Sequence, residues 1–321
     1  MSTADLLWTN VKRLKMIIDA HIHLWNKVTG RLGMQKVSPV ANGVIRIGSK
    51  EYQGMPSWFR DCRSSAELAK AAFDDAGVDA AVVTQEYLDG NQNEYLLDAQ
   101  KKYPGLFFVH GLIGFGEPKR LRNEFASVCK KGFRGIKCPA MFLPQLGVKL
   151  DEPDLMYVWE QMEAEGIVLS IDLTPGDVQV GQMKNVIRNF TKLKIAIGHF
   201  GMVGHGNRMS QIRLAEFENV YIECGGIIWL FRQEGPPFKQ AQSKIRQAMK
   251  AVGAKKLMWG SDYPRTMVDF TYRQSLELAT KGCDFMNEDE KKAFLGGNAA
   301  RIYGFKYQQK NCSPRVRITE L

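Results

Sequence analysis

The stretch MIIDAHIHLW, residues 16–25, places two histidines one residue apart where a short apolar run ends. A short run of apolar and β-branched residues predicts a buried strand. Successive side chains of a strand alternate between its faces, so His21 and His23 point to the same side. Such a pair is typical of a metal-binding hook, but satisfied core histidines have the same pattern. The choice depends on which partners the rest of the chain places nearby.

Seven further short runs have the same character and alternate with amphipathic segments. They show little strict alternation of apolar and polar residues, as expected of parallel strands buried on both faces. Eight strands separated by helices predict an α/β fold of the (β/α)8 TIM-barrel type rather than a doubly wound sheet. The predicted strands are residues 16–20, 79–85, 106–113, 133–138, 167–173, 194–199, 220–225 and 256–261.

The helical segments carry recognisable end signals. The sequence SSAE at 64–67 predicts a capping box, and Gly77 predicts the end of that helix. Pro118 suits the first position of the next clear helix, and Gly132 follows its end. The sequence NEDE at 287–290 again places a side-chain acceptor three residues before a glutamate, which predicts the start of the last helix.

We predict a single domain, because no Pro/Ser-rich linker divides the chain. The barrel is expected over residues 16–306, between an N-terminal extension (1–15) and a C-terminal tail (307–321). The first strand and its helix are separated by residues 26–63, an insertion that emerges at the catalytic face of a barrel. Its MPSWFR segment (55–60), with Trp58, is suited to covering the active site. The alternative is a packed surface insertion.

Bulk composition excludes several classes of protein. The 321 residues are 45% hydrophobic and 24% charged, which is ordinary for a globular chain. Six scattered cysteines without a CxxC pair favour reduced thiols in a cytoplasmic protein, and we see no secretory signal or membrane-spanning run. The net charge of +10 is spread along the chain, which disfavours nucleic-acid binding. It is compatible with a small anionic substrate or with solubility alone.

Polar residues that follow parallel barrel strands converge on one face. Three of the five histidines fall at such positions, and neutral imidazoles with a carboxylate suit zinc and similar ions. The orientation of Glu223 on the seventh strand is left open. The strand-end candidates are His21, His23, Lys137, Asp172, His199 and Asp262, with Trp25, His205, Arg208 and Arg265 in the segments that follow.

Four motifs in this order resemble the amidohydrolase superfamily, in its amidohydrolase-related branch, over residues 16–306. They are DAHIHLW (19–25), GHFG (198–201), WGSDYP (259–264) and LGGNAARIYGF (295–305). The resemblance implies a barrel enzyme acting on a small molecule. The branch includes lactonases of sugars and of pyrone dicarboxylates, and nonoxidative decarboxylases of aromatic or muconate-like acids.

The fifth strand distinguishes these two groups. In the decarboxylases a histidine at its end usually joins the metal site, whereas here IVLSIDL (167–173) offers Ser170 and Asp172. The resemblance is therefore closest to the lactonases, some of which work without a tightly held ion. It implies a divalent cation, with zinc preferred over other metals, and with His21, His23 and Asp262 as its ligands. His199 could be a further ligand. The resemblance also allows the ion to be weakly bound or absent.

We expect hydrolysis of a lactone, with Asp262 as the general base on water and His199 carrying a proton. His21 and His23 would polarise the carbonyl. Arg208 and Arg265 could each pair with a substrate carboxylate. The remaining substrate-binding candidates are Trp25, Trp58, Lys137, Asp172 and His205.

Two alternatives to hydrolysis remain. One is decarboxylation, in which a metal would chelate the substrate carboxylate and Asp262 would protonate a ring carbon. The other is a catalytically inactive binding barrel, against which the intact His21, His23, His199 and Asp262 argue. The sequence leaves the exact substrate open, and it allows a homo-oligomer without requiring one.

Overall fold

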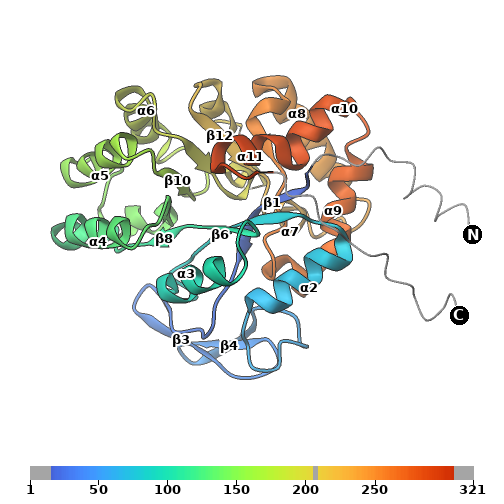
Figure 1. The fold of residues 1–321 in the computed structure, drawn as a ribbon, viewed down its shortest axis with the longest axis horizontal. Helices are drawn as coiled ribbons and strands as arrows, with labels where there is room; N and C mark the ends of the chain where they lie inside the picture. The colour runs from blue at the N-terminus through green and yellow to red at the C-terminus, as the bar shows by residue number, and fades with distance from the viewer. Residues whose placement is uncertain (1–15, 205–208, 307–321) are drawn as a thin grey trace, which may run out of the picture.

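The structure is a computed structural model that describes residues 16–204 and 209–306. Within these residues the predicted strands are present and parallel, and helices surround them in an α/β TIM barrel (Figure 1). The predicted segments 1–15 and 307–321 lie outside the described residues. The strands are β1 (Ile18–His23), β6 (Ala80–Thr84), β7 (Phe107–Val109), β8 (Gly111–Leu112), β9 (Gly135–Cys138), β10 (Val168–Ile171), β11 (Ile195–Ile197), β12 (Val220–Glu223) and β13 (Leu257–Met258).

The barrel strands form two hydrogen-bonded sheets, one of β1, β6 and β7 and one that runs from β8 to β13. The predicted third strand, 106–113, is interrupted at His110, so β7 and β8 are its two halves. On the other side, Ala20 N donates to Trp259 O at 2.9 Å and His23 N to Tyr263 O at 2.7 Å. The eighth strand therefore lies beside the first.

The helix ends follow the sequence signals with one correction. The predicted capping box is wrong by one residue, because Ser65 caps α2 and accepts from Leu68 N. Ser64 instead donates its hydroxyl to His23 O at 2.9 Å. The ends at Gly77, Pro118 and the Asn287 capping box are confirmed. The helices are α2 (Ala66–Ala76), α3 (Asn93–Lys102), α4 (Pro118–Lys130), α5 (Pro153–Ala164), α6 (Val180–Asn189), α7 (Ile227–Leu230), α8 (Lys239–Val252), α9 (Tyr272–Glu277), α10 (Glu288–Lys292) and α11 (Asn298–Tyr303).

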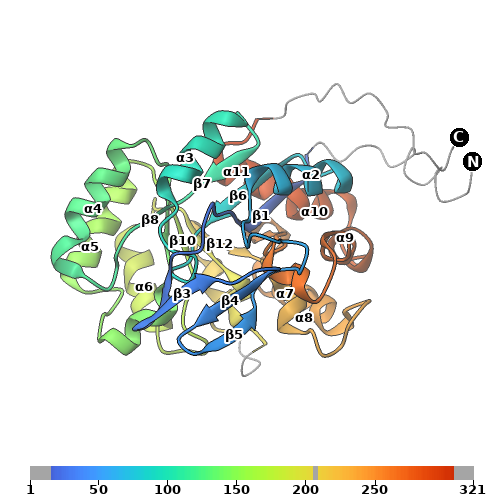
Figure 2. The ribbon, with the colours of Figure 1, turned by 90° about the horizontal axis from the view of Figure 1, so that it is seen from below.

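Residues 26–63 contain a four-stranded antiparallel sheet, β2 (Arg31–Leu32), β3 (Gln35–Pro39), β4 (Val44–Ile47) and β5 (Lys50–Gln53). It follows the carboxyl end of β1 and lies in front of the barrel strands in Figure 2. Val37, Ile45 and Met55 are buried and anchor it to the main core. The insertion is therefore a packed subdomain in its own right rather than a long loop.

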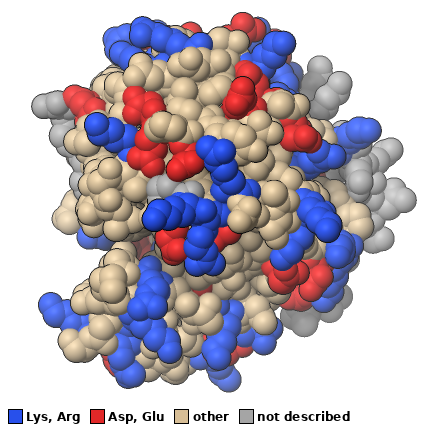
Figure 3. Space-filling view, turned by 90° about the vertical axis from the view of Figure 1, so that its left-hand side faces the viewer, with Lys and Arg blue, Asp and Glu red and all other residues tan. Residues whose placement is uncertain are grey.

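The described surface carries charges of both signs. On the face formed by α4 to α6, lysines and arginines are interspersed with aspartates and glutamates (Figure 3). Several of them pair, as Arg122 does with Asp154 at 3.0 Å. Among the described residues, no helix has both the length and the apolar character that crossing a membrane requires.

Candidate active site

Both histidines of the opening motif lie inside β1, where they meet groups from other strands. Their Nε2 atoms are 3.3 Å apart, as the i, i+2 spacing predicts. Thr84 Oγ1, at the end of β6, lies 3.3 Å from His21 Nε2 and 3.4 Å from His23 Nδ1. The register between β1 and β6 shifts between Asp19 and Ile22, and such an irregularity re-aims side chains. The shift lets both imidazoles share the centre of the site.

Asp262 follows β13 in a left-handed backbone conformation, with a φ of 59°. Its Oδ1 lies 2.9 Å from His23 Nε2, and its Oδ2 accepts from Trp229 Nε1 at 2.7 Å. Burial favours the neutral acid, but the hydrogen bond with His23 and the charge of His199 outweigh it and lower the pKa of Asp262. The carboxylate is therefore ionised near neutral pH and can accept a proton.

His199 follows β11 and also has a positive φ, of 48°. Its ring centroid lies 4.7 Å from that of His21 and 5.7 Å from that of Trp229. The preceding Gly198 is required, because a Cβ there would lie 2.0 Å from Asp172 Oδ1. Left-handed residues cluster at functional sites, and this one sets the imidazole against the β1 pair.

Three of these residues could hold a metal ion. One ligand atom from each of His21, His199 and Asp262 lies within 4.8 Å of the others. Burial and nearby cationic groups hold the pKa of His21 well below its usual range, so the ring is neutral as a ligand must be. His199 Nδ1 is buried without a hydrogen-bond partner in the described part of the chain. This donor set fits a zinc-type ion with a position left for water or substrate.

Lys137 and Asp172 form a buried ion pair beside this centre. The ammonium lies 2.6 Å from Asp172 Oδ2 and 3.8 Å from Glu86 Oε1. Burial disfavours charge on Asp172, but Lys137 overcomes it and the pKa of Asp172 is lowered. Burial and the charge of Asp172 instead raise the pKa of Glu86. Asp172 Oδ2 also lies 3.6 Å from His199 Nε2, which links the pair to the histidines.

The other predicted substrate-binding residues differ in their burial and in their contacts. Trp25 is fully buried, and its Nε1 donates to Cys62 O at 2.7 Å. Arg265 donates to Gly54 O at 2.6 Å and pairs with Asp89, so its guanidinium anchors the insertion to the segment after β6. Trp58 is 68% exposed. The predicted His205 and Arg208 lie outside the described residues.

Sequence reasoning left the orientation of Glu223 open and missed Trp229, Thr84 and Glu86. Glu223 is fully buried, with Oε2 2.9 Å from His21 Nδ1, and burial raises its pKa to about 8. Trp229 lies on the apolar helix α7, which offers no strand-end signal. One clue is Gly226, which has a φ of 70° and whose Cβ would lie 1.9 Å from Trp229 Nε1. Only glycine there lets the indole reach Asp262.

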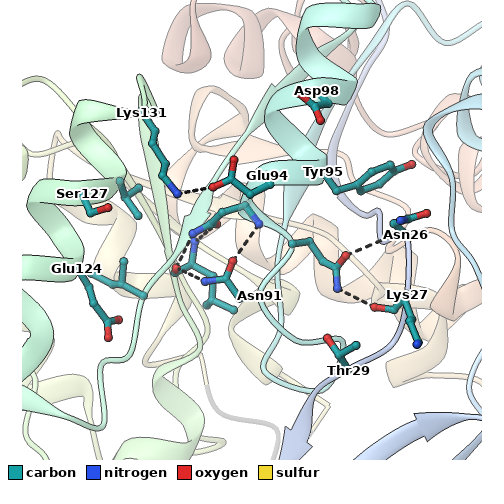
Figure 4. Close-up of a pocket in the computed structure, with 15 residues that line it drawn as sticks. Asn26, Lys27, Thr29, Asn91, Glu94, Tyr95, Asp98, Glu124, Ser127 and Lys131 are labelled. Atoms are coloured by element: carbon teal, nitrogen blue, oxygen red, sulfur yellow. Dashed lines mark hydrogen bonds and ion pairs between the residues drawn. The ribbon is translucent and has the colours of Figure 1, made fainter.

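A cavity of about 630 Å³ lies apart from this centre, between α3, α4 and the start of the insertion (Figure 4). Its lining includes Asn26, Asn91 and Tyr95, and Lys131 pairs with Glu94 across it. None of His21, His23, His199 and Asp262 is among its lining residues. The strand-end cluster and this cavity are therefore separate features of the described structure.

Polar side chains gathered at the carboxyl ends of barrel strands are typical of an enzyme active site. The family model for amidohydrolases matches residues 18–305. The chain therefore belongs to the amidohydrolase family, and it is an enzyme.

The chain is 24% identical over 299 residues to an L-fucono-1,5-lactonase of Burkholderia ambifaria, covering 89% of this chain and 94% of that protein. An amidohydrolase of Burkholderia multivorans with bound zinc is 17% identical, with a TM-score of 0.71 over 91% of this chain and 100% of the other. A probable 2-pyrone-4,6-dicarboxylic acid hydrolase of Acinetobacter baumannii, solved with citric acid, is 19% identical with a TM-score of 0.69 over 90% and 99%.

A 5-carboxyvanillate decarboxylase of Sphingomonas paucimobilis matches a smaller share of the structure. It is 18% identical, with a TM-score of 0.56 over 74% of this chain and 83% of the other. These structural similarities establish the shared barrel fold, and the chemistry has to be argued from the side chains.

Proposed function

We propose that the enzyme hydrolyses a lactone, either a sugar lactone or a carboxylated pyrone or muconolactone. The observation that carries the proposal is the position of Asp262, whose ionised carboxylate contacts His23 and Trp229 beside His21 and His199. A general base must lie within hydrogen-bond reach of the water that it activates. The names of the lactonase and pyrone hydrolase relatives support the same substrate class.

In the proposed reaction, water loses a proton to Asp262 as its oxygen bonds to the carbonyl carbon. The ring C–O bond then breaks, and the leaving alkoxide takes up a proton by way of His199. The product is a hydroxy acid, which ionises and releases one proton to the solvent. A positioned base of this kind accelerates a reaction by about 10²–10⁴-fold.

His21, His199 and Asp262, with His23 beside them, would hold a divalent cation, for which we propose zinc. When bound, such an ion polarises the carbonyl as a Lewis acid. The buried pair of Lys137 and Asp172 orients His199 through the 3.6 Å contact with Asp172 Oδ2. That contact favours a proton on His199 Nε2, which the leaving alkoxide requires.

Decarboxylation is the main alternative in the same pocket. The end of β10 offers Ser170 and Asp172, and Asp172 is already committed to Lys137 at 2.6 Å. The fifth strand therefore brings to the site a carboxylate paired with a lysine, and not a histidine. This arrangement favours hydrolysis.

A panel of sugar lactones and carboxylated pyrones or muconolactones, alongside aromatic acids, tests the proposal. Proton release is followed with a pH indicator, and carbon dioxide is followed in parallel by mass spectrometry. We expect proton release on at least one lactone, without carbon dioxide. Carbon dioxide from an aromatic acid, with no opening of any lactone, would show that the enzyme is a decarboxylase. Inertness of the zinc-loaded enzyme towards the whole panel would favour a binding barrel.

A further inference from the structure

The C-terminal helix α11 packs against the interior of the barrel. Its residues Ala299, Ile302 and Tyr303 share one buried cluster with inward-facing residues of five strands. Barrel interiors are usually filled by bulky branched side chains. Here several inward positions are alanines, which leave room for the Tyr303 ring. The strand residues of this cluster are Ile18, Ala20, Ala80, Val82, Val168, Ala196 and Met258.

From this position Tyr303 reaches the catalytic end of the barrel. Its hydroxyl donates to Glu223 Oε1 at 2.6 Å, and Glu223 Oε2 lies 2.9 Å from His21 Nδ1. The exposed fractions of Tyr303, Glu223 and His21 are 7%, 0% and 0%, so water does not compete for these contacts. The three residues form one continuous buried hydrogen-bond chain.

The chain of contacts determines which nitrogen of His21 faces the site. Nδ1 faces Glu223, so Nε2 is the atom that lies near His23 and Thr84. The ring is also confined, because a Cβ on Gly225 would lie 2.6 Å from His21 Cγ. A histidine that donates through one nitrogen to a carboxylate presents the lone pair of the other nitrogen to a metal or substrate.

We propose that Tyr303 is a positioning residue of the active site. Its hydroxyl anchors one oxygen of Glu223, and the other oxygen holds His21 with the proton on Nδ1 and the lone pair on Nε2. The value of that lone pair for catalysis rests on the proposed function, but the tautomer itself does not. The last described helix thereby supports the first strand through the barrel interior.

Nuclear magnetic resonance of metal-free protein with ¹⁵N-labelled histidine reads this tautomer directly. The chain has five histidines, and the signals of His21 are assigned by their loss in His21→Asn. We expect a single His21 tautomer with the proton on Nδ1 in spectra recorded above about pH 8, where Glu223 is a carboxylate that can only accept. In Tyr303→Phe, which keeps the ring, the two His21 nitrogens should shift toward a mixture. Unchanged His21 signals in that variant, or a wild-type proton on Nε2, would overturn the proposal.

Zinc affinity provides a second readout. Removing the hydrogen-bond partner of a ligand histidine weakens metal binding by about 10–100-fold, so we expect that range for Glu223→Gln and about tenfold for Tyr303→Phe. Tyr95→Phe is the control, because it removes a tyrosine oxygen whose partner, Ala66 N at 2.9 Å, belongs to helix α2 and not to this hydrogen-bond chain. Its zinc affinity should equal that of the wild type. Equal weakening in the control would point to general destabilisation instead.

The double variant tests whether Tyr303 acts through Glu223. Residues in one hydrogen-bond network show non-additive effects. We therefore expect Tyr303→Phe to weaken zinc binding less in the Glu223→Gln background than in the wild type. Effects that simply multiply would contradict the proposal. The tautomer measurement needs neither substrate nor metal, so a failure of the lactonase proposal would not be mistaken for a failure of this one.

Discussion

Replacing Trp229 with phenylalanine removes one hydrogen-bond donor from Asp262 and keeps an aromatic ring beside His199. Trp229 Nε1 donates to Asp262 Oδ2 at 2.7 Å, and its ring centroid lies 5.7 Å from that of His199. A hydrogen bond to a charged group contributes about 1.5–3 kcal/mol. Because one pKa unit corresponds to about 1.4 kcal/mol, loss of this bond should raise the pKa of Asp262 by about one to two units.

The sign of the effect follows from the role of the carboxylate. Asp262 accepts a proton only when it is ionised, so raising its pKa moves the acid limb of kcat/KM to higher pH. We expect a shift of about one pH unit or more, measured on the best lactone of the panel at closely spaced pH values. Activity on the alkaline side of that limb should change much less.

Trp159→Phe is the matched control. Trp159 Nε1 donates to a backbone carbonyl, Leu150 O, at 2.9 Å inside the core around α5. This variant should lose stability but keep the acid limb of the wild type. An unmoved acid limb in Trp229→Phe, or an equal shift in the control, would refute the reasoning.

Three further predictions concern buried groups around the site. Lys137→Met leaves Asp172 buried without the ammonium that lies 2.6 Å away, so the free energy of unfolding in urea titrations should fall by about 3–5 kcal/mol. The double variant Lys137→Met/Asp172→Asn should recover part of that lost stability. A loss below about 1 kcal/mol would contradict this. In Arg265→Lys the side chain cannot contact both Gly54 O and Asp89, so limited proteolysis should cut the 26–63 insertion faster than in the wild type. An unchanged rate of cleavage would show that Arg265 does not anchor the insertion. Burial lowers the pKa of His110 to about 3. The unfolded chain therefore binds a proton below about pH 6.5 that the folded chain does not, and stability falls by about 2 kcal/mol at pH 5. His110→Gln should flatten that pH dependence, and equal slopes would contradict the assignment.

The barrel and the centre of the site could be predicted from local sequence. Short apolar runs with helices between them imply parallel strands, and the carboxyl ends of such strands converge whatever the details of packing. The proximity of His21, His23, His199 and Asp262 could therefore be predicted without any knowledge of long-range contacts.

Contacts between segments that are distant in the chain could not be predicted from local sequence. Tyr303 and Glu223 are 80 residues apart, and Arg265 and Asp89 are 176 apart, so no local period relates them. The orientation of Glu223 depends on the helix that fills the barrel interior. Arg265 has the chemistry of a carboxylate binder, but its partners are Gly54 of the insertion and Asp89 of the segment that follows β6.

The sequence of the insertion does contain a local signal for its sheet, in the turn between β3 and β4. Asn42 and Gly43 both have positive φ, of 51° and 76°, and Val44 N donates to Ala41 O at 2.9 Å. An Asn-Gly pair between apolar residues is a strong signal for a tight hairpin turn. It joins β3 to β4 and explains why residues 26–63 fold into a sheet.

The central claim is that Asp262 accepts the proton of the attacking water, and the turnover of Asp262→Asn tests it most directly. Asparagine keeps the shape of the side chain but cannot act as the base, so kcat on the best lactone should fall by about 10²–10⁴-fold while circular dichroism stays unchanged. Asp269→Asn, an exposed carboxylate in the same segment, should keep full activity. Turnover of Asp262→Asn at the wild-type rate would contradict the account.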